Sequence, residues 1–284
     1  MNPVAHAVRL GLARGWIEFR HGLTSSTDIY FNAFIAIAFV VVLYFQREVT
    51  LPGTNLSLSA ATLPGMLALL VVVGGLAGTV GTLSVEREDG TLLRAKALPH
   101  GMTGYLVGKI IVTSAGGLVT MLIVLVAGLV MVPAIRQPGA GEWTLFAGTV
   151  ALGLLAMLPW GAVIGSLISN PQAAGGLSML SISLLTTTSG IFYPITSMPE
   201  WLQVVSQIFP LYWLALGMRA ALAPDGAVAA EIGQSWREFE TLGVLGLWAL
   251  AGLLLAPPIL RRMARRESGS AVQQRRERAI QRVG

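Results

Sequence analysis

The sequence predicts an all-α integral membrane protein with six transmembrane helices, an amino-terminal interfacial helix and short re-entrant helices in the outer leaflet between spans five and six. Composition supports this fold class, because only 12% of the 284 residues are charged and 54% are hydrophobic, whereas a soluble chain is about 25% charged. Mean hydropathy is +0.69. Several stretches without charged side chains also approach about 20 residues, the length that crosses roughly 30 Å of hydrocarbon.

The first element is predicted in residues 1–28, which form a loosely amphipathic helix. Its apolar side chains fall on one arc at helical spacing: Val4, Val8, Leu12, Trp16 and Phe19. We interpret this segment as a helix lying in the cytoplasmic interface of the membrane. An ordinary positively charged flank of the first span is the alternative.

The transmembrane domain is predicted in residues 29–260. Its six spans are free of ionisable residues and cover 29–45, 63–83, 110–132, 143–169, 173–193 and 241–260. Spans four and five are separated at Asn170-Pro171-Gln172, because proline ends a helix and asparagine favours a turn. The last span is expected to end at Pro257-Pro258, before a cluster of arginines.

The orientation follows from lysine and arginine, which are enriched in cytoplasmic loops. Fifteen of the 19 Lys and Arg residues lie on the side that contains both termini and the segment between spans two and three. We therefore expect both termini in the cytoplasm. The basic tail, residues 261–284, is expected to face anionic lipid headgroups rather than nucleic acid, which is the less favoured interpretation.

Several kinds of chemistry are disfavoured by what the sequence lacks. Spans without ionisable groups count against a proton-coupled carrier and against an intramembrane protease. With no cysteine in the chain, cysteine-bound zinc and thiol nucleophiles are excluded. The nearest approach to a phosphate-binding loop, residues 103–110, lacks its first glycine and its terminal Ser or Thr. We expect no catalytic, cofactor or metal residues, so energy for uphill transport must come from another chain.

Two segments that connect spans have residue patterns that a simple connecting loop does not need. In the loop 84–109, an acid-base cluster precedes a turn at Asp89-Gly90 and a short helix over 91–98, stopped by Pro99. This helix is suited to docking on a soluble partner, and a solvated hairpin is the alternative.

In the outer region 194–219, prolines forbid one continuous helix, so short helices that dip into the outer leaflet are expected. Trp201, Tyr212 and Trp213 suit the headgroup level, and a plain aromatic belt is the alternative.

Together these segments resemble the permease subunit of type-2 ATP-binding-cassette exporters, in particular the daunorubicin-resistance-like drug exporters. Glu86-Arg87-Glu88 before Gly90-Thr91, with Pro99 and Gly108-Lys109 following, resembles the cytoplasmic loop of that family. Gly190 through Pro194, then Met198-Pro199 and Trp201-Leu202, with Pro210 beyond, resembles its pattern after span five. The six-span layout extends the likeness over essentially the whole chain.

The resemblance implies a permease that pairs with a second permease, as a homodimer or heterodimer, and with a separate ATPase that holds ATP and magnesium. It implies a coupling helix at 91–98, with contacts to the ATPase from Glu86, Arg87, Glu88, Gly90, Thr91, Leu93 and Arg94. It implies an outer re-entrant gate that contains Gly190, Phe192, Pro194, Met198, Pro199, Trp201 and Pro210. Hydrogen-bonding groups of a substrate path are expected at Asn32, Thr186, Thr187 and Ser189.

The expected function is export of a hydrophobic or amphipathic compound, such as a drug, a natural product or a lipid-like molecule. A membrane anchor or assembly subunit that recruits a cytoplasmic partner without transport is the alternative. Two small-residue spacings, Gly74-x-x-x-Gly78 and Gly161-x-x-x-Gly165, are expected to allow helices to pack closely and slide. Simple tight packing within one subunit is their other interpretation.

Overall fold

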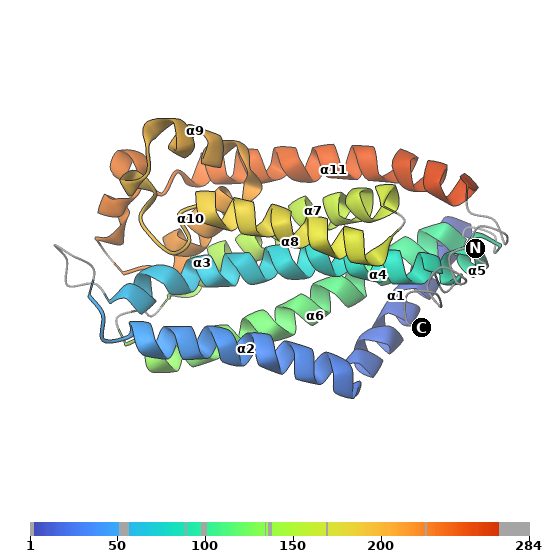
Figure 1. Cartoon of the computed structure of the whole chain (residues 1–284), viewed down its shortest axis with the longest axis horizontal. Helices are drawn as coiled ribbons and strands as arrows, with labels where there is room; N and C mark the ends of the chain where they lie inside the picture. The colour runs from blue at the N-terminus through green and yellow to red at the C-terminus, as the bar shows by residue number, and fades with distance from the viewer. Residues whose placement is uncertain are drawn as a thin grey trace.

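The computed structural model describes residues 3–50, 57–88, 90–97, 101–133, 135, 138–168, 170–224 and 226–266. These residues are mostly helical, with no named strand among them. Long helices run roughly along the long axis of the molecule (Figure 1). The longer helices are α1 (Pro3–Gly22), α2 (Ser26–Gln46), α3 (Leu58–Val72), α4 (Gly78–Glu88), α6 (Gly101–Met131), α7 (Ala140–Leu167), α8 (Pro171–Thr188), α10 (Pro210–Leu222) and α11 (Glu238–Arg266).

Shorter helical pieces lie at the two ends of the bundle. One end, here called the α5 end, carries α5 (Thr91–Lys96) and the last turn of α11, at the right of Figure 1. The opposite end, the α9 end, carries α9 (Glu200–Ile208). Single 3-10 turns occupy Ile195–Ser197, Ala227–Ala230 and Ile232–Gln234. A π-helical turn, Val73–Ala77, joins α3 to α4 in one continuous helix.

Within the described residues, five helices are long and apolar enough to cross a membrane, and a sixth crossing is reached if the bent pair α9–α10 counts as one span. The five candidate spans lie in α2, α3–α4, α6, α7 and α11. The fifth sequence-predicted span, 173–193, corresponds to α8. This helix stops at Thr188, because Gly190 adopts φ +67°, a left-handed conformation that interrupts a helix.

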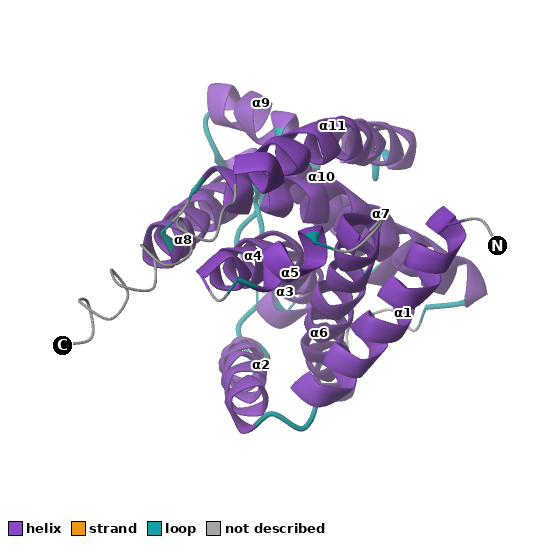
Figure 2. Cartoon of the chain, turned by 90° about the vertical axis from the view of Figure 1, so that its right-hand side faces the viewer, coloured by secondary structure: helices purple, strands orange, loops and turns teal. Residues whose placement is uncertain are grey.

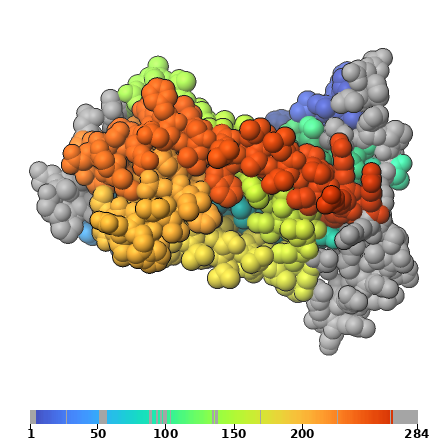
Figure 3. Space-filling model, turned by 90° about the horizontal axis from the view of Figure 1, so that it is seen from above, coloured from blue at the N-terminus to red at the C-terminus, as the bar shows by residue number. Residues whose placement is uncertain are grey.

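The sixth predicted span ends later than expected. α11 continues through Pro257-Pro258 to Arg266, so the prediction that these prolines end the helix is wrong. The fixed φ of proline is compatible with a helix, and membrane helices tolerate the freed backbone groups. α11 lies along one face of the molecule beside α8 and α9 (Figure 3). Six leucines of α11 are exposed: Leu242, Leu247, Leu250, Leu253, Leu254 and Leu255.

The core is built around α10, which is buried along its whole length against α3 and α7. A 91° bend separates α9 from α10, at the point where Pro210 opens the second helix. Trp201 on α9 is 66% exposed, but Tyr212 and Trp213 are 0% and 3% exposed. Tyr212 and Trp213 therefore do not expose their rings as the sequence led us to expect, because α10 turns inward and carries both rings into the core.

Glycines bring α1 against α6, and the two helices lie side by side in Figure 2. A Cβ on Gly15 would lie 2.7 Å from the Gly108 carbonyl oxygen, and one on Gly104 would lie 2.9 Å from that of Ala7. The apolar arc of α1 points elsewhere, since Leu12 and Trp16 are 49% and 57% exposed. Small residues therefore hold α1 to the bundle, and Leu12 and Trp16 of its apolar arc stay exposed.

The two small-residue spacings found in the sequence also pack within this one chain. A Cβ on Gly74 would meet the Cα of Gly117 on α6 at 2.9 Å, and one on Gly161 would meet the Leu76 carbonyl oxygen at 2.6 Å. Backbones approach this closely only where no side chain intervenes. The interpretation of these spacings as tight packing within one subunit is the one that the geometry supports.

Candidate coupling site

The short helix α5 is fixed to the end of the bundle by its own apolar side chains. Gly90 turns the chain with φ +79°, a conformation that glycine adopts without steric cost. Leu92 and Ala95 are then 1% and 6% exposed. They pack in a small cluster that joins α4, α6, α7 and α11: Leu83, Tyr105, Val163, Ala256, Leu260 and Met263. Arg94 lies on the exposed side of α5, where its guanidinium donates to the Thr91 hydroxyl at 3.0 Å.

Glu86, in the last turn of α4, joins that helix to α6. Its carboxylate accepts a hydrogen bond from the Tyr105 hydroxyl and one from Lys109 Nζ at 2.8 Å. The side chains of Glu86 and Lys109 are only 14% and 11% exposed. A buried pair of this kind holds α4 and α6 in one arrangement, because separating the partners would leave a buried charge unpaired.

The amino-terminal helix contributes to the same group of charges. Glu18 of α1 lies 4.0 Å from Lys109 Nζ and 2.6 Å from the Arg14 guanidinium. Burial opposes the charge on Arg14, but the Glu18 and Glu86 carboxylates raise its pKa above the ordinary value. We call Arg14, Glu18, Glu86, Tyr105 and Lys109 the coupling network. It connects α1, α4 and α6 at the α5 end.

Arg87 points to a different helix. Its side chain is buried, and Nη1 donates to the carbonyl oxygens of Gly165, Ser166 and Ile168 at 3.0–3.2 Å. These carbonyls end α7, where a helix leaves acceptors unpaired and its dipole favours a cation. Arg87 thus ties the last turn of α4 to the last turn of α7.

The structure separates the sequence-predicted coupling residues into two groups. Glu86 and Arg87 face inward and connect helices to one another, whereas Arg94 faces outward. Leu92, which belongs to the helix that the sequence suggested for docking on a partner, is buried inside its own chain. The side chains of Glu88 and Leu93 and all of Leu98 lie outside the described residues. Contact of this region with an ATPase stays a prediction.

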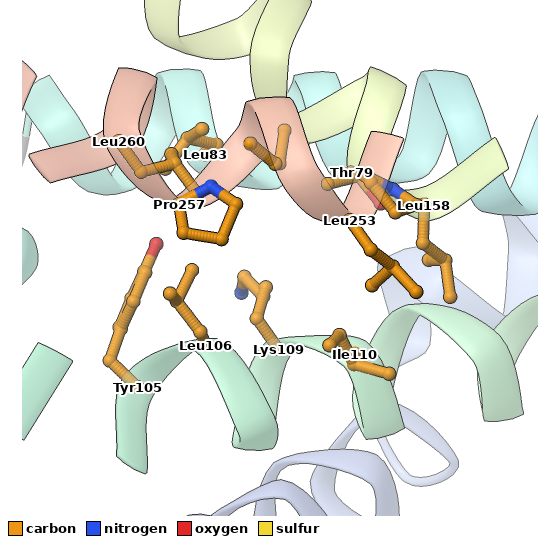
Figure 4. Close-up of a pocket in the computed structure, with 13 residues that line it drawn as sticks. Thr79, Leu83, Tyr105, Leu106, Lys109, Ile110, Leu158, Leu253, Pro257 and Leu260 are labelled. Carbon is orange, nitrogen blue, oxygen red and sulfur yellow. The ribbon is translucent and has the colours of Figure 1, made fainter. Parts of the chain in front are cut away.

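A small apolar cavity of about 120 Å³ lies beside the network, between α6 and α11. Figure 4 shows Tyr105 and Lys109 rising from α6 toward Pro257 of α11. Both polar groups are bonded to Glu86, and the remaining lining is almost entirely aliphatic. The cavity suits a hydrocarbon chain rather than a charged ligand.

The predicted outer gate residues lie at the α9 end. Gly190 follows α8, and its backbone approaches Ile195 closely. Pro194 and Pro199 precede the 3-10 turn and α9, respectively. Met198 and Pro210 are buried, while Phe192 is 38% exposed. These residues form one compact turn structure between α8 and α10, and their role as a gate stays a prediction.

The same region contains a buried ion pair that the sequence did not predict. Arg219 of α10 lies 2.6 Å from Glu231, and both side chains are less than a tenth exposed. The sequence placed Arg219 in an outer loop, because nothing in the local pattern shows that α10 folds back into the core.

The predicted substrate-path residues are divided in the structure. The Thr186 and Thr187 hydroxyls donate to carbonyl oxygens one turn earlier in α8, and Ser189 donates to the Thr186 carbonyl. Asn32 of α2 instead lies in a large cavity, where its side-chain oxygen accepts from Thr120 at 3.0 Å. Only Asn32 among the four lines that cavity.

The coupling network was missed by sequence reasoning, although one signal for it was present. Gly11-x-x-x-Gly15 and Gly104-x-x-x-Gly108 have the same spacing as the motifs singled out elsewhere. Pairing them would have placed α1 on α6 and brought Glu18 toward Lys109. No local signal connects Arg87 to carbonyls some eighty residues away.

Comparison with known proteins agrees with this architecture. The family described as ABC-2 type transporter matches residues 6–223. Two Escherichia coli proteins, from strains K12 and O157:H7, are each described as "Probable multidrug ABC transporter permease YbhR" and are 29% identical over 159 residues. The alignment covers 55% of this chain and 42% of each relative, so the chain matches less than half of their length. Because the family match covers most of the chain, this membrane protein belongs to the ABC-2 type transporter family.

Proposed function

We propose that the chain is the membrane-spanning permease subunit of an ATP-driven exporter, powered by a separate ATPase subunit that binds ATP and magnesium. Its cargo is a hydrophobic or amphipathic compound, and it works beside a second permease in a bacterial plasma membrane with both termini in the cytoplasm. The family supports transport, and the description of the two Escherichia coli relatives as multidrug permeases supports a multidrug type of cargo.

The observation that carries the proposal is the way α5 is mounted. A six-residue helix is locked by Leu92 and Ala95 into the ends of four long helices, and it presents Arg94 to the outside. Force applied to such an element is passed to the long helices instead of being absorbed by a flexible loop. Glu86 and Arg87 then transmit it, because they tie α4 to α6 and α7.

Copurification tests the partner. The tagged chain is expressed with a candidate ATP-binding-cassette ATPase from the same genome, and Arg94→Glu is compared with Arg47→Glu. Arg47 is also exposed but lies after α2, at the α9 end. We expect Arg94→Glu to weaken ATPase binding about tenfold, since a reversed charge at an interface repels its partner. Arg47→Glu should bind as the unmodified chain does. Equal binding of both variants would show that α5 is not the docking element.

Transport is tested with the purified complex in proteoliposomes, by ATP-dependent accumulation of a lipophilic dye. We expect accumulation that stops when magnesium is removed, because the partner ATPase requires it. A complex that retains the ATPase but accumulates no member of a dye panel would instead support the non-transporting anchor.

A further inference from the structure

A second, larger cavity lies where α1 turns into α2, and we call it the elbow cavity. Its volume is about 370 Å³, and it is bounded by α1, α2, α3, the π turn, α4, α6 and one residue of α8. Figures 1 and 2 show α2 at the edge of the bundle. Only 11% of the apolar membrane-span stretch of α2 is buried within the described chain. A volume above about 300 Å³ is typical of small-molecule sites.

The cavity is kept open by glycine on α6. A Cβ on Gly116 would meet nothing within 4 Å, whereas one on the adjacent Gly117 would meet Gly74 Cα at 3.1 Å. Gly117 therefore makes the contact between α6 and the π turn, and Gly116 leaves space. A π turn beside this space is a further local irregularity of the kind that is frequent at functional sites.

The walls of the cavity are mainly apolar, with a few hydrogen-bonding groups. Apolar side chains come from Phe31, Ile35, Leu70, Val73 and Met179. The Asn32 side-chain oxygen is bonded to Thr120, but its amide nitrogen has no partner among the described residues. Thr113 also lines the cavity, and its buried hydroxyl has none within the described part of the chain. This is the lining expected for a largely apolar ligand with a polar group.

The charged groups that line the cavity are both acidic. Glu18 is already paired with Arg14 and approached by Lys109. Asp28, exposed in the first turn of α2, has no cation within 4 Å in the described ranges. The α1–α2 side of the cavity therefore offers an uncompensated carboxylate next to apolar walls.

We propose that the elbow cavity binds the cargo, and that the cargo is a cationic amphipathic molecule. Its positive group lies at Asp28, and its apolar body lies between α2 and α6. This inference rests on the proposed function and names the substrate class and the place of binding. A cationic group is favoured over an anionic one, because a like charge beside a carboxylate is repelled.

Binding is measured with the full chain in dodecyl maltoside, without ATPase or ATP. Equilibrium dialysis with radiolabelled tetraphenylphosphonium is compared with tetraphenylborate, an anion of the same shape. We expect saturable binding of the cation that is about tenfold tighter than binding of the anion. Asp28→Asn should weaken cation binding by about the same factor, because it removes the charge and keeps the shape.

The cavity itself is tested by filling it. Gly116→Leu places a side chain in open space and should abolish saturable binding of the cation. Gly148→Leu is the matched control, because a Cβ there also meets nothing within 4 Å and Gly148 is exposed on α7, away from the cavity. It should bind as the unmodified chain does, and both variants should elute from size exclusion as the unmodified chain does.

Three results would overturn the proposal: unchanged affinity in Gly116→Leu, equal affinity for the two ions, or displacement of the cation by equimolar phosphatidylethanolamine. The last result would make the cavity a lipid site. Failure here is distinct from failure of the proposed function. Asp28-dependent binding without ATP-driven transport would refute the exporter function. ATP-driven transport that is unchanged in Gly116→Leu would refute only the assignment of the cavity as the cargo site.

Discussion

Replacing Gly15 by alanine should loosen α1 from α6, and the structure sets the size of the effect. The new Cβ would lie 2.7 Å from the Gly108 carbonyl oxygen and 3.0 Å from its Cα. Ordinary contact begins near 3.4 Å, so the helices must separate by about 0.7 Å. A gap of this size forfeits a quarter to a half of the dispersion attraction along the seam. Overpacking against backbone costs about 1–3 kcal/mol.

Alanine also gains stability as a better helix former, by about 0.5–1 kcal/mol over glycine. With the middle of each range, about 2 and about 0.75 kcal/mol, the net loss for Gly15→Ala is about 1.25 kcal/mol. Gly148→Ala has the same helix term and no clash, so it should be neutral or stabilising. The two substitutions are chemically identical, but Gly15→Ala is expected to lower stability and Gly148→Ala is not.

Tryptic cleavage of α1 provides the assay, because Arg9 and Arg20 are exposed on this helix. When local opening limits cleavage, the rate follows the population of the detached state. The net free-energy loss above gives about an eightfold faster loss of intact chain in Gly15→Ala. No acceleration should occur in Gly148→Ala. Equal rates in both variants would refute the account of α1 as a helix held by backbone contact.

Three further substitutions test the charges of the bundle by thermal unfolding in detergent. Arg87→Met should lower the free energy of unfolding by about 2–4 kcal/mol, because it leaves the last carbonyls of α7 without their donor. Arg94→Met, at an exposed position of α5, should change it by less than about 0.5 kcal/mol. Similar losses in the two variants would contradict the bonding of Arg87 to the end of α7. Lys109→Met should cost about 3–5 kcal/mol by leaving its carboxylate partner on α4 uncompensated, and neutralising that partner as well should recover part of the loss. Arg219→Met should likewise cost more alone than together with Glu231→Leu, and a simple sum of the two single effects would rule out coupling of this pair.

Charge-free length was enough to locate most of the membrane helices from the sequence. Residues 29–45, 63–83 and 143–169 fall almost entirely within α2, α3–α4 and α7. Boundaries that depend on proline were harder, since Pro210 opens a helix at a 91° bend while Pro257 lies inside one. The difference arises from packing around each proline, which the local pattern does not contain.

The candidate site was less predictable, because its contacts are distant in sequence. The loop 84–109 was correctly singled out as unusual, but Arg87 meets a helix end formed by residues 165–168. The burial of α10 reversed the expectation for Tyr212, because aromatic composition alone does not distinguish a headgroup position from a core position. Of the four polar residues proposed for a substrate path, only Asn32 lines the elbow cavity, and hydroxyls on a helix commonly bond their own backbone.

The π turn at Val73–Ala77 sets the angular phase between α3 and α4. Such a turn absorbs one extra residue in the winding, and each residue of a regular helix corresponds to about 100° of rotation and 1.5 Å of advance. Rewinding the turn to α geometry with every residue kept would rotate α4 by about 100° relative to α3, which takes Arg87 off the α7 carbonyls. Deleting one residue from the turn would remove the irregularity and keep Arg87 in place. The bundle should therefore accept a shortening here more readily than an insertion, because only the shortening keeps α4 in the phase that places Arg87 on α7.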